Sequence, residues 1–267
     1  MPELPEVETI VRQLRDKVKG KTISSVEVYD TMVVDKNLKK VSKTKIKDVN
    51  RRAKSIIMEL SDNRFLLTHL RMTGHFHYLD GKRIDNDHKK FMVGKFDFSD
   101  GSFLTHNSIR KFGSIKLLDK RQLDLELNKC GPEPLDKNFT LQDFRDILSK
   151  KNKSNIKTML MDPYVLAGIG NIYAQETLYY AAVSPLRKAG SLSARESSDL
   201  YNNMQRILKK AIEEQGCTVD NYSNLEGKGG FQNFLAVYGK ERCLKGHPLK
   251  KINIGGRGTS YCEICQR

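Results

Sequence analysis

Apolar residues near the start of the chain recur at the spacing of one helix face. Five of them fall between residues 7 and 18, and Gly20 stands where such a helix would end. They are Val7, Ile10, Val11, Leu14 and Val18. Pro5 suits the first helical turn, and the acidic residues around it suit the positive end of the helix dipole. The pattern predicts an amphipathic helix that begins near Pro5.

Between residue 22 and about residue 120, the pattern changes to short segments of alternating, often β-branched residues. Turn signals such as Asp80-Gly81 and Ser99-Asp100-Gly101 separate these segments. Strands at this density predict an antiparallel sandwich or barrel. The predicted strands include residues 22–29, 55–60, 64–70, 91–98 and 102–106.

The composition changes at residues 129–134, which are typical of a linker. Helical patterns follow: Thr140 and Asp143 could cap one helix, and Ser193 and Glu196 form a capping box ahead of another that Gly216 would end. The final thirty residues return to short strands. We therefore predict an α+β fold with four parts. These are a helix and antiparallel β-sandwich over residues 1–128, a linker over 129–136, a helical domain over 137–236 and a β-hairpin over 237–267.

The bulk composition narrows the class of protein. The 267 residues carry a formal net charge of +15 with a pI near 9.5, which indicates a polyanionic partner, most simply a nucleic acid. A lysine-rich host composition would also produce this charge. No apolar run reaches membrane-spanning length, and residues 1–20 lack the continuous apolar core of a signal peptide. We expect a soluble, cytoplasmic protein without membrane contact.

Four residues near the carboxyl end have the types and spacing of metal ligands. Three residues separate Cys243 from His247, two separate Cys262 from Cys265, and fourteen lie between the pairs. Three thiolates and one imidazole form a closed tetrahedral set that suits one structural Zn²⁺ ion. The alternative is that Cys243 and His247 are incidental. The five cysteines, an odd number, do not suit a secreted disulfide framework.

The start of the chain also carries candidate catalytic groups. Methionine is usually removed when proline follows it, which would leave Pro2 with a free secondary amine. A free α-amine has a reference pKa near ~8, so part of it is a neutral nucleophile at physiological pH. Its attack on a sugar C1′ would give an iminium, and Glu3 and Glu6 could act on the sugar, on water or on the amine. A simple helix start is the alternative interpretation.

A second candidate site is the Gly-x-Gly pair at positions 168 and 170, which Asn171 follows. Glycines let a backbone run close to a phosphate, and a helix start offers unpaired N–H groups to an anion. A tight turn is the usual explanation for such a pair when it stands alone. The surrounding residues, 161–174, make the pattern more specific.

Residues 1–9, Met-Pro-Glu-Leu-Pro-Glu-Val-Glu-Thr, resemble the amino terminus of bacterial formamidopyrimidine-DNA glycosylase. The likeness continues to the last residue, and residues 161–174 resemble the helix–two-turn–helix motif of that family. The resemblance implies that Pro2 is the nucleophile, that Glu3 assists at the deoxyribose and that Glu6 supports catalysis.

The same resemblance assigns roles at the DNA. Lys54 would reach the active site and the DNA backbone, although its pattern alone is that of a basic strand edge. Met72, Arg110 and Phe112 would enter the duplex. An apolar wedge and an aromatic ring between base steps, with an arginine in the emptied stack, offset the cost of unstacking. Lys111 would contact a phosphate. A lone methionine such as Met72 is ordinarily a core residue.

Further residues are implied at the phosphate backbone: Lys157, Asn171, Tyr238 and Arg257. Residues 237–267 hold seven Lys and Arg residues against two Glu, and this excess of positive charge suits a phosphate clamp. The chain departs from the family at Ser108-Ile109, where Asp-Pro is usual. It also departs at His247, where the common zinc finger has a second Cys-x₂-Cys pair.

The glycine-rich residues 217–231 are typical of a mobile loop. In position and approximate length they resemble the loop with which purine-specific members cover a flipped 8-oxoguanine. The resemblance therefore implies a bifunctional DNA glycosylase and abasic-site lyase of base excision repair. It would act as a monomer with one structural Zn²⁺ ion on damaged double-stranded DNA. Oxidised purines would be removed through a Pro2 Schiff base and β,δ-elimination.

Three other functions stay open at this point. An endonuclease VIII-like glycosylase for oxidised pyrimidines is the nearest, because some of its relatives have a Cys-x₃-His finger. A non-catalytic DNA-damage binder is disfavoured by the presence of all four candidate catalytic residues. A zinc transcription factor is disfavoured because one finger offers little base readout.

Overall fold

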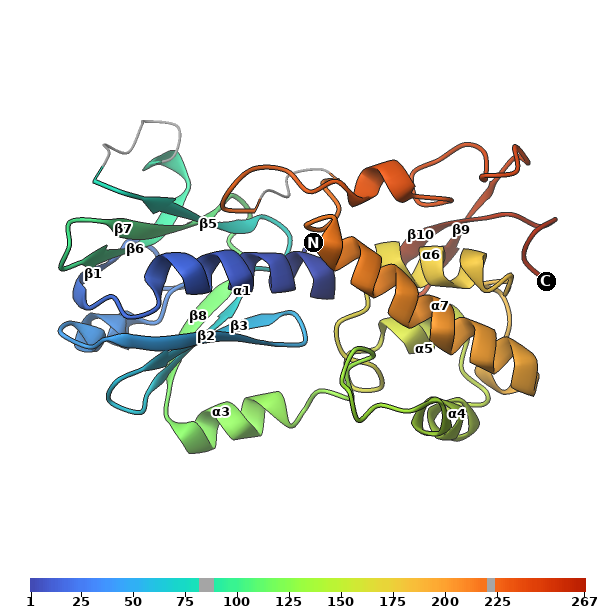
Figure 1. The fold of residues 1–267 in the computed structure, drawn as a ribbon, viewed down its shortest axis with the longest axis horizontal. Coiled ribbons are helices and arrows are strands. Elements are labelled where there is room, and N and C mark those ends of the chain that lie inside the picture. The colour runs from blue at the N-terminus through green and yellow to red at the C-terminus, as the bar shows by residue number, and fades with distance from the viewer. Residues whose placement is uncertain (82–88, 220–223) are drawn as a thin grey trace. The chain divides into compact units, whose positions relative to one another are not determined.

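The computed structural model describes residues 1–81, 89–219 and 224–267 (Figure 1). The chain forms two compact units. Unit 1 contains Met1–Asn128 and Gln215–Gly230, and unit 2 contains Lys129–Glu214 and Phe231–Arg267. The predicted α+β class with antiparallel sheets is confirmed. The division into four domains stays a prediction.

Unit 1 is built from the helix α1 (Leu4–Val18) and two four-stranded antiparallel sheets. One sheet has the order β1-β6-β7-β5, with β1 at Ile23–Val28, β6 at Met92–Phe98, β7 at Phe103–Ser108 and β5 at Gly74–Leu79. The other has the order β2-β3-β4-β8, with β2 at Ile46–Arg52, β3 at Ser55–Leu60, β4 at Phe65–His69 and β8 at Ser114–Leu118. Unit 1 also contains the 3₁₀ helix η1 (Lys36–Val41) and the helix α3 (Lys120–Leu127).

The apolar face predicted for the first helix is confirmed. Its five residues are all but completely buried, in a core cluster that also takes side chains from both sheets. Burial of a side chain of this size contributes roughly 1.5–3 kcal/mol. α1 packs along β2 (Figure 1), and Gly20 follows it with a φ of 85°, which glycine adopts without strain.

Unit 2 consists mainly of helices. They are α4 (Leu141–Lys150), α5 (Ile156–Met161), α6 (Asn171–Tyr180), α7 (Ala194–Glu213) and the 3₁₀ helices η2 (Ala189–Ser191) and η3 (Phe231–Phe234). The two predicted helix starts are confirmed, because the Thr140 hydroxyl accepts the N–H of Asp143 and the Ser193 hydroxyl accepts that of Glu196, both at 3.2 Å. The helix α6 packs against α5 and α7.

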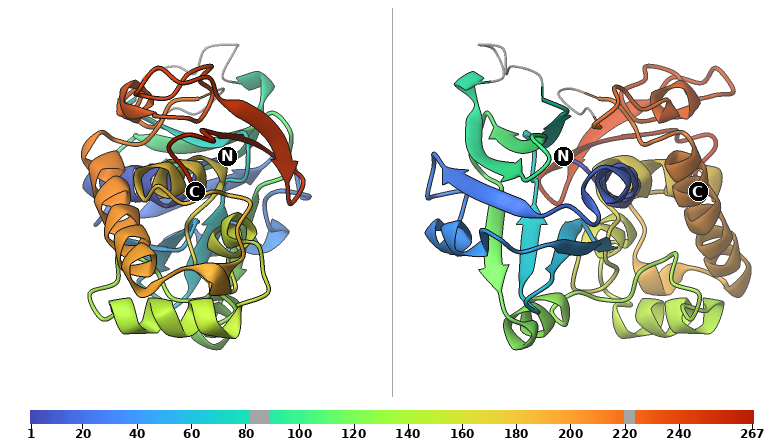
Figure 2. Two further views of the ribbon diagram at one scale, coloured as in Figure 1. Left: turned by 90° about the vertical axis from the view of Figure 1, so that its right-hand side faces the viewer. Right: turned by 60° about the vertical axis from the view of Figure 1, so that its left-hand side comes forward.

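A β-hairpin completes the carboxyl end of unit 2. Its strands are β9 (Lys250–Ile254) and β10 (Arg257–Tyr261), and Figure 2 shows it in red beside α6, which β10 contacts. Ile254 pairs with Arg257, so Gly255 and Gly256 alone form the turn, with φ values of 59° and 73°. Two consecutive positive φ values match the twist of a two-residue hairpin turn and favour glycine at both positions.

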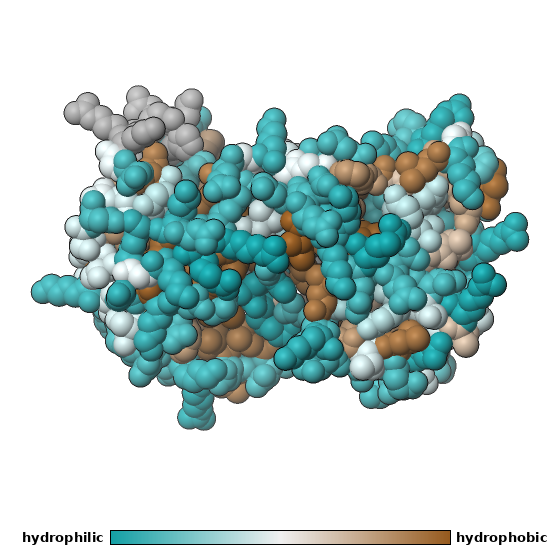
Figure 3. Space-filling view, viewed as in Figure 1, coloured by the Kyte–Doolittle hydropathy of each residue, from teal (hydrophilic) through white to brown (hydrophobic). Residues whose placement is uncertain are grey.

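Polar side chains dominate the face drawn in Figure 3, with smaller apolar patches between them. Phe112 is one of several exposed aromatic residues, with 59% of its surface accessible. Within the described ranges, no helix combines the length and the apolar content that a membrane crossing requires.

His106 on β7 is a buried titratable group in unit 1. Its side chain is completely buried, and its ring lies 5.0 Å from that of Phe76 between centroids. Neither ring nitrogen has a hydrogen-bond partner among the described residues. Burial, together with the nearby His75, lowers the pKa of His106 to about 3, because the charged imidazolium would lose its hydration.

We expect His106→Met to flatten the loss of stability in acid. The folded pKa lies below the usual value of 6.5, so below pH 6.5 the unfolded chain binds the extra proton and the free energy of unfolding falls. The histidine contributes up to ~1.4 kcal/mol per pH unit to that slope. Urea unfolding of both proteins between pH 7.5 and 4.5 measures it. Parallel pH profiles for the two proteins would contradict the assignment.

Candidate active site and nucleic-acid interface

The carboxyl group of Glu6 joins the start of the chain to a distant segment. The N–H of Glu3 donates to Glu6 Oε2, and the N–H of Cys217 donates to Glu6 Oε1, both at 2.8 Å. Glu3, Glu6 and Pro2 are all buried. Both oxygens thus accept a backbone donor, as the burial of a polar group requires. The first three predicted catalytic residues form one fixed group, whose individual roles stay predictions.

Glycines allow the segment around Cys217 to lie close to the Glu6 carboxyl group. Gly216 has a φ of 85°, and a Cβ there would lie 2.9 Å from Glu6 Cγ and 3.0 Å from Glu6 Oε1. A Cβ on Gly229 would lie 2.2 Å from the carbonyl oxygen of Gly216. The sequence indicated Gly216 only as a helix end, so its contact with Glu6 was missed. No local pattern reports a contact across more than two hundred residues.

Lys54, the fourth predicted catalytic residue, lies in the turn between β2 and β3. Arg51 stabilises this turn, because its Nη1 donates to the carbonyl of Ala53 at 2.9 Å and its Nε to Glu8 Oε2 at 2.8 Å. Ala53 has a φ of 53°, a value that non-glycine residues rarely adopt. Burial would raise the pKa of Glu8, but hydrogen bonds from Arg51 and Arg12 lower it below its usual value. The sequence did not indicate that Glu8 and Arg51 stabilise the turn that contains Lys54.

The three side chains predicted to enter the duplex lie together at the surface of unit 1. Arg110 Nη1 is 3.9 Å from the sulfur of Met72, and its guanidinium carbon is 5.0 Å from the centre of the Phe112 ring. Arg110 and Phe112 are exposed, whereas Met72 is half-buried. A cation over an aromatic face is attracted by the ring quadrupole, so the contact favours this grouping before any ligand binds. Intercalation itself stays a prediction.

Short hydrogen-bonded turns support this group. The N–H of Arg110 donates to the Thr73 hydroxyl at 2.9 Å, and that of Lys111 to the Ser108 hydroxyl at 3.1 Å. Ser108, one of the two residues that depart from the family pattern, therefore closes the turn through its side chain. The Nζ of Lys111 forms an ion pair with Asp30 at 2.8 Å. This ion pair competes with the predicted contact of Lys111 with a phosphate.

His69 orients the turn that precedes Met72. Its Nδ1 accepts the N–H of Arg71 at 3.2 Å. Burial, helped by the charges of Arg71 and Lys54, lowers the pKa of His69 to about 4. The imidazole is therefore neutral at physiological pH, which leaves Nδ1 able to accept this bond.

In unit 2, Lys157 on α5 connects α6 with the hairpin. Its side chain is completely buried, and Nζ donates to Asn171 Oδ1 at 2.7 Å and to the Thr259 hydroxyl at 2.6 Å. Asn171 in turn donates to the carbonyl of Gly258 at 3.2 Å. Gln175 bonds to the same hairpin, where it accepts the N–H of Ser260 at 2.6 Å. The sequence predicted Lys157 and Asn171 as neighbours at a phosphate but missed Thr259 and Gln175.

Tyr238 is the last of three consecutive residues whose N–H groups donate to a buried carboxyl group. Glu176, which is completely buried on α6, accepts the N–H groups of Ala236 at 2.7 Å, Val237 at 3.1 Å and Tyr238 at 2.8 Å. Burial raises the pKa of Glu176, and the three N–H donors oppose that rise. The sequence does not indicate this role for Glu176, because a position within a helical pattern gives no signal of a contact sixty residues away.

Arg257 is exposed and comes directly after the two-glycine turn of the hairpin. A Cβ on Gly255 would lie 2.6 Å from Thr158 Cγ2. Glycine at this position therefore permits the tip of the hairpin to approach α5 closely. The predicted placement of Arg257 at a hairpin tip is confirmed, and its phosphate contact stays a prediction.

The four predicted metal ligands come together in unit 2. One ligand atom from each of Cys243, His247, Cys262 and Cys265 lies within 4.8 Å of the others. His247 Nδ1 is 3.6, 3.7 and 3.3 Å from the sulfurs of Cys243, Cys262 and Cys265. Zn–S bonds of ~2.3 Å and a Zn–N bond of ~2.0 Å in a tetrahedron would separate sulfur from nitrogen by roughly 3.5 Å. The donor set therefore fits one tetrahedral ion, with Nδ1 as the ligand of His247.

The surroundings also favour a thiolate at this cluster. Burial would raise the pKa of the Cys243 thiol, but the N–H groups of Lys245 and His247 lower it to about 6. Gln266 supports the Cys262 side by accepting its N–H at 2.9 Å and donating to the carbonyl of Val183 at 2.9 Å. Such bonds fix ligand positions around a metal.

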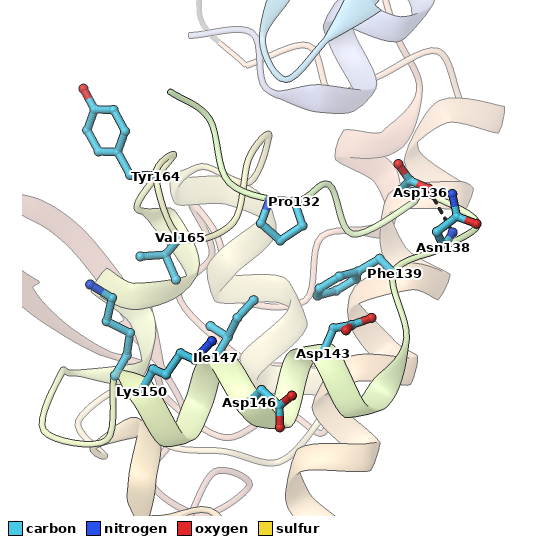
Figure 4. Close-up of a pocket in the computed structure, with 11 residues that line it drawn as sticks. Pro132, Asp136, Asn138, Phe139, Asp143, Asp146, Ile147, Lys150, Tyr164 and Val165 are labelled. Carbon is cyan, nitrogen blue, oxygen red and sulfur yellow. Dashed lines mark hydrogen bonds between the residues drawn. The ribbon is translucent and has the colours of Figure 1, made fainter. Parts of the chain in front are cut away.

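A pocket of about 600 Å³ lies elsewhere in unit 2, between α4 and two flanking segments (Figure 4). Pro132, Phe139, Ile147 and Val165 give it apolar walls, and its rim carries both acidic and basic side chains. It contains none of the predicted site residues. The pocket is therefore not part of the candidate site.

Two protein-family models match the chain. That of the formamidopyrimidine-DNA glycosylase N-terminal domain covers residues 1–115, and that of the formamidopyrimidine-DNA glycosylase H2TH domain covers residues 130–223. The chain belongs to the formamidopyrimidine-DNA glycosylase family. The resemblance inferred from the amino terminus and from residues 161–174 is confirmed.

Individual proteins and solved structures are similar to the chain over its full length or nearly so. The formamidopyrimidine-DNA glycosylase of Lactobacillus acidophilus is 40% identical to the chain, and the match covers 100% of the chain and 99% of the relative. That of Streptococcus mutans is 39% identical, and the match covers 100% of both proteins. A Lactococcus lactis Fpg in complex with abasic-site DNA is a structural neighbour with a TM-score of 0.90 and 35% identity, over 99% of both chains. A mutant of the L. lactis protein with Fapy-dG DNA also has a TM-score of 0.90, with 35% identity over 100% of both chains.

We expect Gly216→Ala to destabilise unit 1 more than Gly101→Ala does. Both glycines have nearly the same φ, 85° and 86°, but a methyl group meets Glu6 at position 216 and nothing within 4 Å at position 101. The shared backbone strain costs ~1–2 kcal/mol, and the clash at Glu6 adds at least ~1 kcal/mol. Urea unfolding measures both. Equal losses for the two variants would show that the contact with Glu6 is unimportant.

Proposed function

We propose that the chain is a bifunctional DNA glycosylase and abasic-site lyase that removes 8-oxoguanine and formamidopyrimidines from double-stranded DNA as a monomer. The observation that carries this proposal is the buried group of Pro2, Glu3 and Glu6, in which Glu6 accepts the N–H of Glu3. Family membership supplies the reaction class. Solved relatives in complex with abasic-site and Fapy-dG DNA support the choice of substrate.

The chemistry starts from the Pro2 amine that removal of Met1 exposes. The nitrogen attacks C1′ of the damaged nucleotide; an N–C1′ bond forms, and the glycosidic bond breaks with its electron pair leaving on the base, which takes up a proton. Assistance by Glu3 at the deoxyribose opens the sugar and gives the iminium. Loss of a C2′ proton expels the 3′ phosphate, and a second elimination expels the 5′ phosphate. A one-nucleotide gap remains after water releases the sugar fragment.

Two sets of residues would hold the DNA. Met72, Arg110 and Phe112 would fill the space that the flipped nucleotide leaves, where Arg110 could bond to the orphaned base. The contacts among these three residues support the role, because they hold the group at an exposed position. The phosphates would be held by Lys54, Lys111, Asn171, Tyr238 and Arg257. Lys157, predicted as a further phosphate contact, has a completely buried side chain and would act through its bond to Asn171.

One Zn²⁺ ion would be bound by Cys243, His247, Cys262 and Cys265. When bound, it supplies a closed structural site that fixes the hairpin, since four protein ligands leave no open coordination position. The chemistry at the sugar falls to the Pro2 amine and the carboxyl groups instead.

We expect borohydride to trap the intact protein covalently on abasic-site and 8-oxoguanine DNA. Insertion of one glutamate between Met1 and Pro2 should abolish trapping, because the Pro2 nitrogen then becomes a tertiary amide. Intact mass should show that Met1 is absent from the active protein. Trapping by the extended chain, or full activity with Met1 attached, would overturn the proposal.

The preference for one kind of damaged base is tested separately from the lyase chemistry. Single-turnover excision is compared on duplexes with 8-oxoguanine opposite cytosine and on duplexes with thymine glycol. Faster excision of 8-oxoguanine is the expected result. The reverse order would assign the chain to oxidised pyrimidines, and trapping on neither duplex would indicate a non-catalytic binder of damaged DNA.

We expect one Zn²⁺ ion per chain, which metal analysis after dialysis measures directly. His247→Cys should retain the ion, since four thiolates also form a tetrahedral set, whereas Cys262→Ser should lose it. Cys130→Ser is the control, because Cys130 is not a member of the cluster. Unchanged metal content in Cys262→Ser would contradict the assignment of the ligands.

A further inference from the structure

A second pocket, of about 420 Å³, lies in unit 2 and is lined by residues of α6, α7 and η3 (Figure 1). Ile207 and Phe231 in its lining are buried, whereas Phe234 is 43% exposed. Phe231 ends the glycine-rich stretch 217–231 of the sequence, of which residues 220–223 lie outside the described residues. No predicted site residue is among the described residues that line this pocket, so the proposed function does not explain it.

Three cationic side chains belong to the same lining: Arg206, Lys209 and Lys210, all on α7. Residues three and four apart lie on one face of a helix, so these charges gather on the side of α7 that borders the pocket. The negative end of the helix dipole also favours lysines near the end of α7. It gives no reason for the aromatic side chains around them.

Two of these cations lie over aromatic rings of the pocket. The guanidinium carbon of Arg206 is 4.7 Å from the centre of the Tyr180 ring, and Nζ of Lys210 is 4.9 Å from the centre of the Phe234 ring. A ring face attracts a cation, so each contact holds both of its members. The Tyr180 hydroxyl also donates to the carbonyl of Phe234 at 3.5 Å. The pocket is therefore formed without a ligand.

The positive charge around the pocket is only partly neutralised. Lys210 forms ion pairs with Glu214 at 2.7 Å and with Glu213 at 3.9 Å. Arg206 donates instead to a neutral amide oxygen, at 3.3 and 2.9 Å. Lys209 has no acidic partner within the part of the chain that the structure describes. The rim at Arg206 and Lys209 therefore favours anionic groups.

The position of these charges narrows the chemistry of the ligand. Arg206 and Lys209 are exposed, so anions would bind at the rim while an apolar group enters the pocket. A base of single-stranded nucleic acid binds by stacking on an aromatic face. Cations already occupy a face of Tyr180 and a face of Phe234, so stacking there would displace the groups that the phosphates need. These contacts favour a peptide chain over a nucleic acid.

We propose that this pocket binds an acidic segment of a partner protein, in which aspartates or glutamates flank one large apolar side chain. The apolar side chain lies against Ile207 and Phe234, and the acidic side chains bond to Arg206 and Lys209. An apolar centre with a polar rim is the usual anatomy of a protein interface. This binding is additional to the DNA-repair function proposed above and does not depend on it.

Two fluorescent peptides test the chemistry of the partner. One is Asp-Glu-Asp-Phe-Asp-Glu-Asp, and the other has serine in place of phenylalanine. We expect the protein to bind the phenylalanine peptide ~10-fold more tightly by fluorescence anisotropy, because the buried centre of an interface contributes most of its affinity. Phe234→Ser should remove this difference. Equal affinity of the intact protein for the two peptides would overturn the proposal.

Two double variants with the same change in net charge separate the pocket from the general positive charge of the chain. Arg206→Gln with Lys209→Gln should weaken binding of the phenylalanine peptide ~5-fold, because two exposed ion pairs are lost together. Lys150→Gln with Lys151→Gln, at the pocket of about 600 Å³, is the control and should change the affinity by less than ~2-fold. Equal losses in both would show that binding follows net charge alone.

Single-stranded oligothymidylate tests for a nucleic acid in the pocket. Its affinity should be the same in the two double variants, since both lose two positive charges. A selective loss in Arg206→Gln with Lys209→Gln would assign the pocket to nucleic acid and overturn the proposal.

Methyl NMR locates the bound peptide without any activity measurement. The Ile207 methyl signals should shift when the phenylalanine peptide is added. Those of Ile147, which lines the pocket of about 600 Å³, should stay unchanged and provide the internal control. Unshifted Ile207 signals under saturating peptide would place the peptide elsewhere and refute the assignment.

Discussion

A single buried carboxyl group, that of Glu6, constrains the arrangement of unit 1 around the start of the chain. Its two oxygens accept N–H groups from Glu3 and from Cys217, so movement of either segment would break a buried hydrogen bond. Removing one partner of such a bond costs ~1–3 kcal/mol, more than a typical bond contributes when it forms. Pro2 directly precedes Glu3, whose N–H this carboxyl group accepts. Its position is therefore determined by long-range hydrogen bonds as well as by the burial of α1.

Buried side chains also accept backbone N–H groups inside unit 2. Glu176 accepts three consecutive N–H groups from residues 236–238, and Gln175 accepts the N–H of Ser260. Both side chains belong to α6, a helix with buried residues around most of its circumference. Irregular chain such as residues 236–238 cannot satisfy its own N–H groups, and each strand of a two-stranded sheet leaves one edge unpaired, so buried side chains of a neighbouring helix satisfy these groups. Polar residues inside a helix mark where non-helical segments are held.

Local patterns predicted the elements, and long-range contacts explain what they missed. The apolar face of α1, the capping boxes at Thr140 and Ser193, and the four metal ligands all depend on spacings of a few residues, which the sequence displays directly. The contacts of Glu6 with Cys217, of Arg51 with Glu8 and of Glu176 with residues 236–238 join segments that folding alone brings together. A glutamate in a helix has the same local pattern whether it faces water or three buried N–H groups. These supports could not be predicted from the sequence.

The four predicted metal ligands and the residues predicted to contact phosphates in unit 2 are connected through one strand. Cys262 follows Tyr261, the last residue of β10, and Thr259 in the same strand accepts a hydrogen bond from the buried Lys157, which also bonds to Asn171. A shift of β10 by one residue would reverse the face on which Thr259 lies. An ion bound at Cys262 would therefore act on Lys157 and Asn171 through the register of the hairpin. Such an ion would fix where Arg257, Lys157 and Asn171 lie relative to one another.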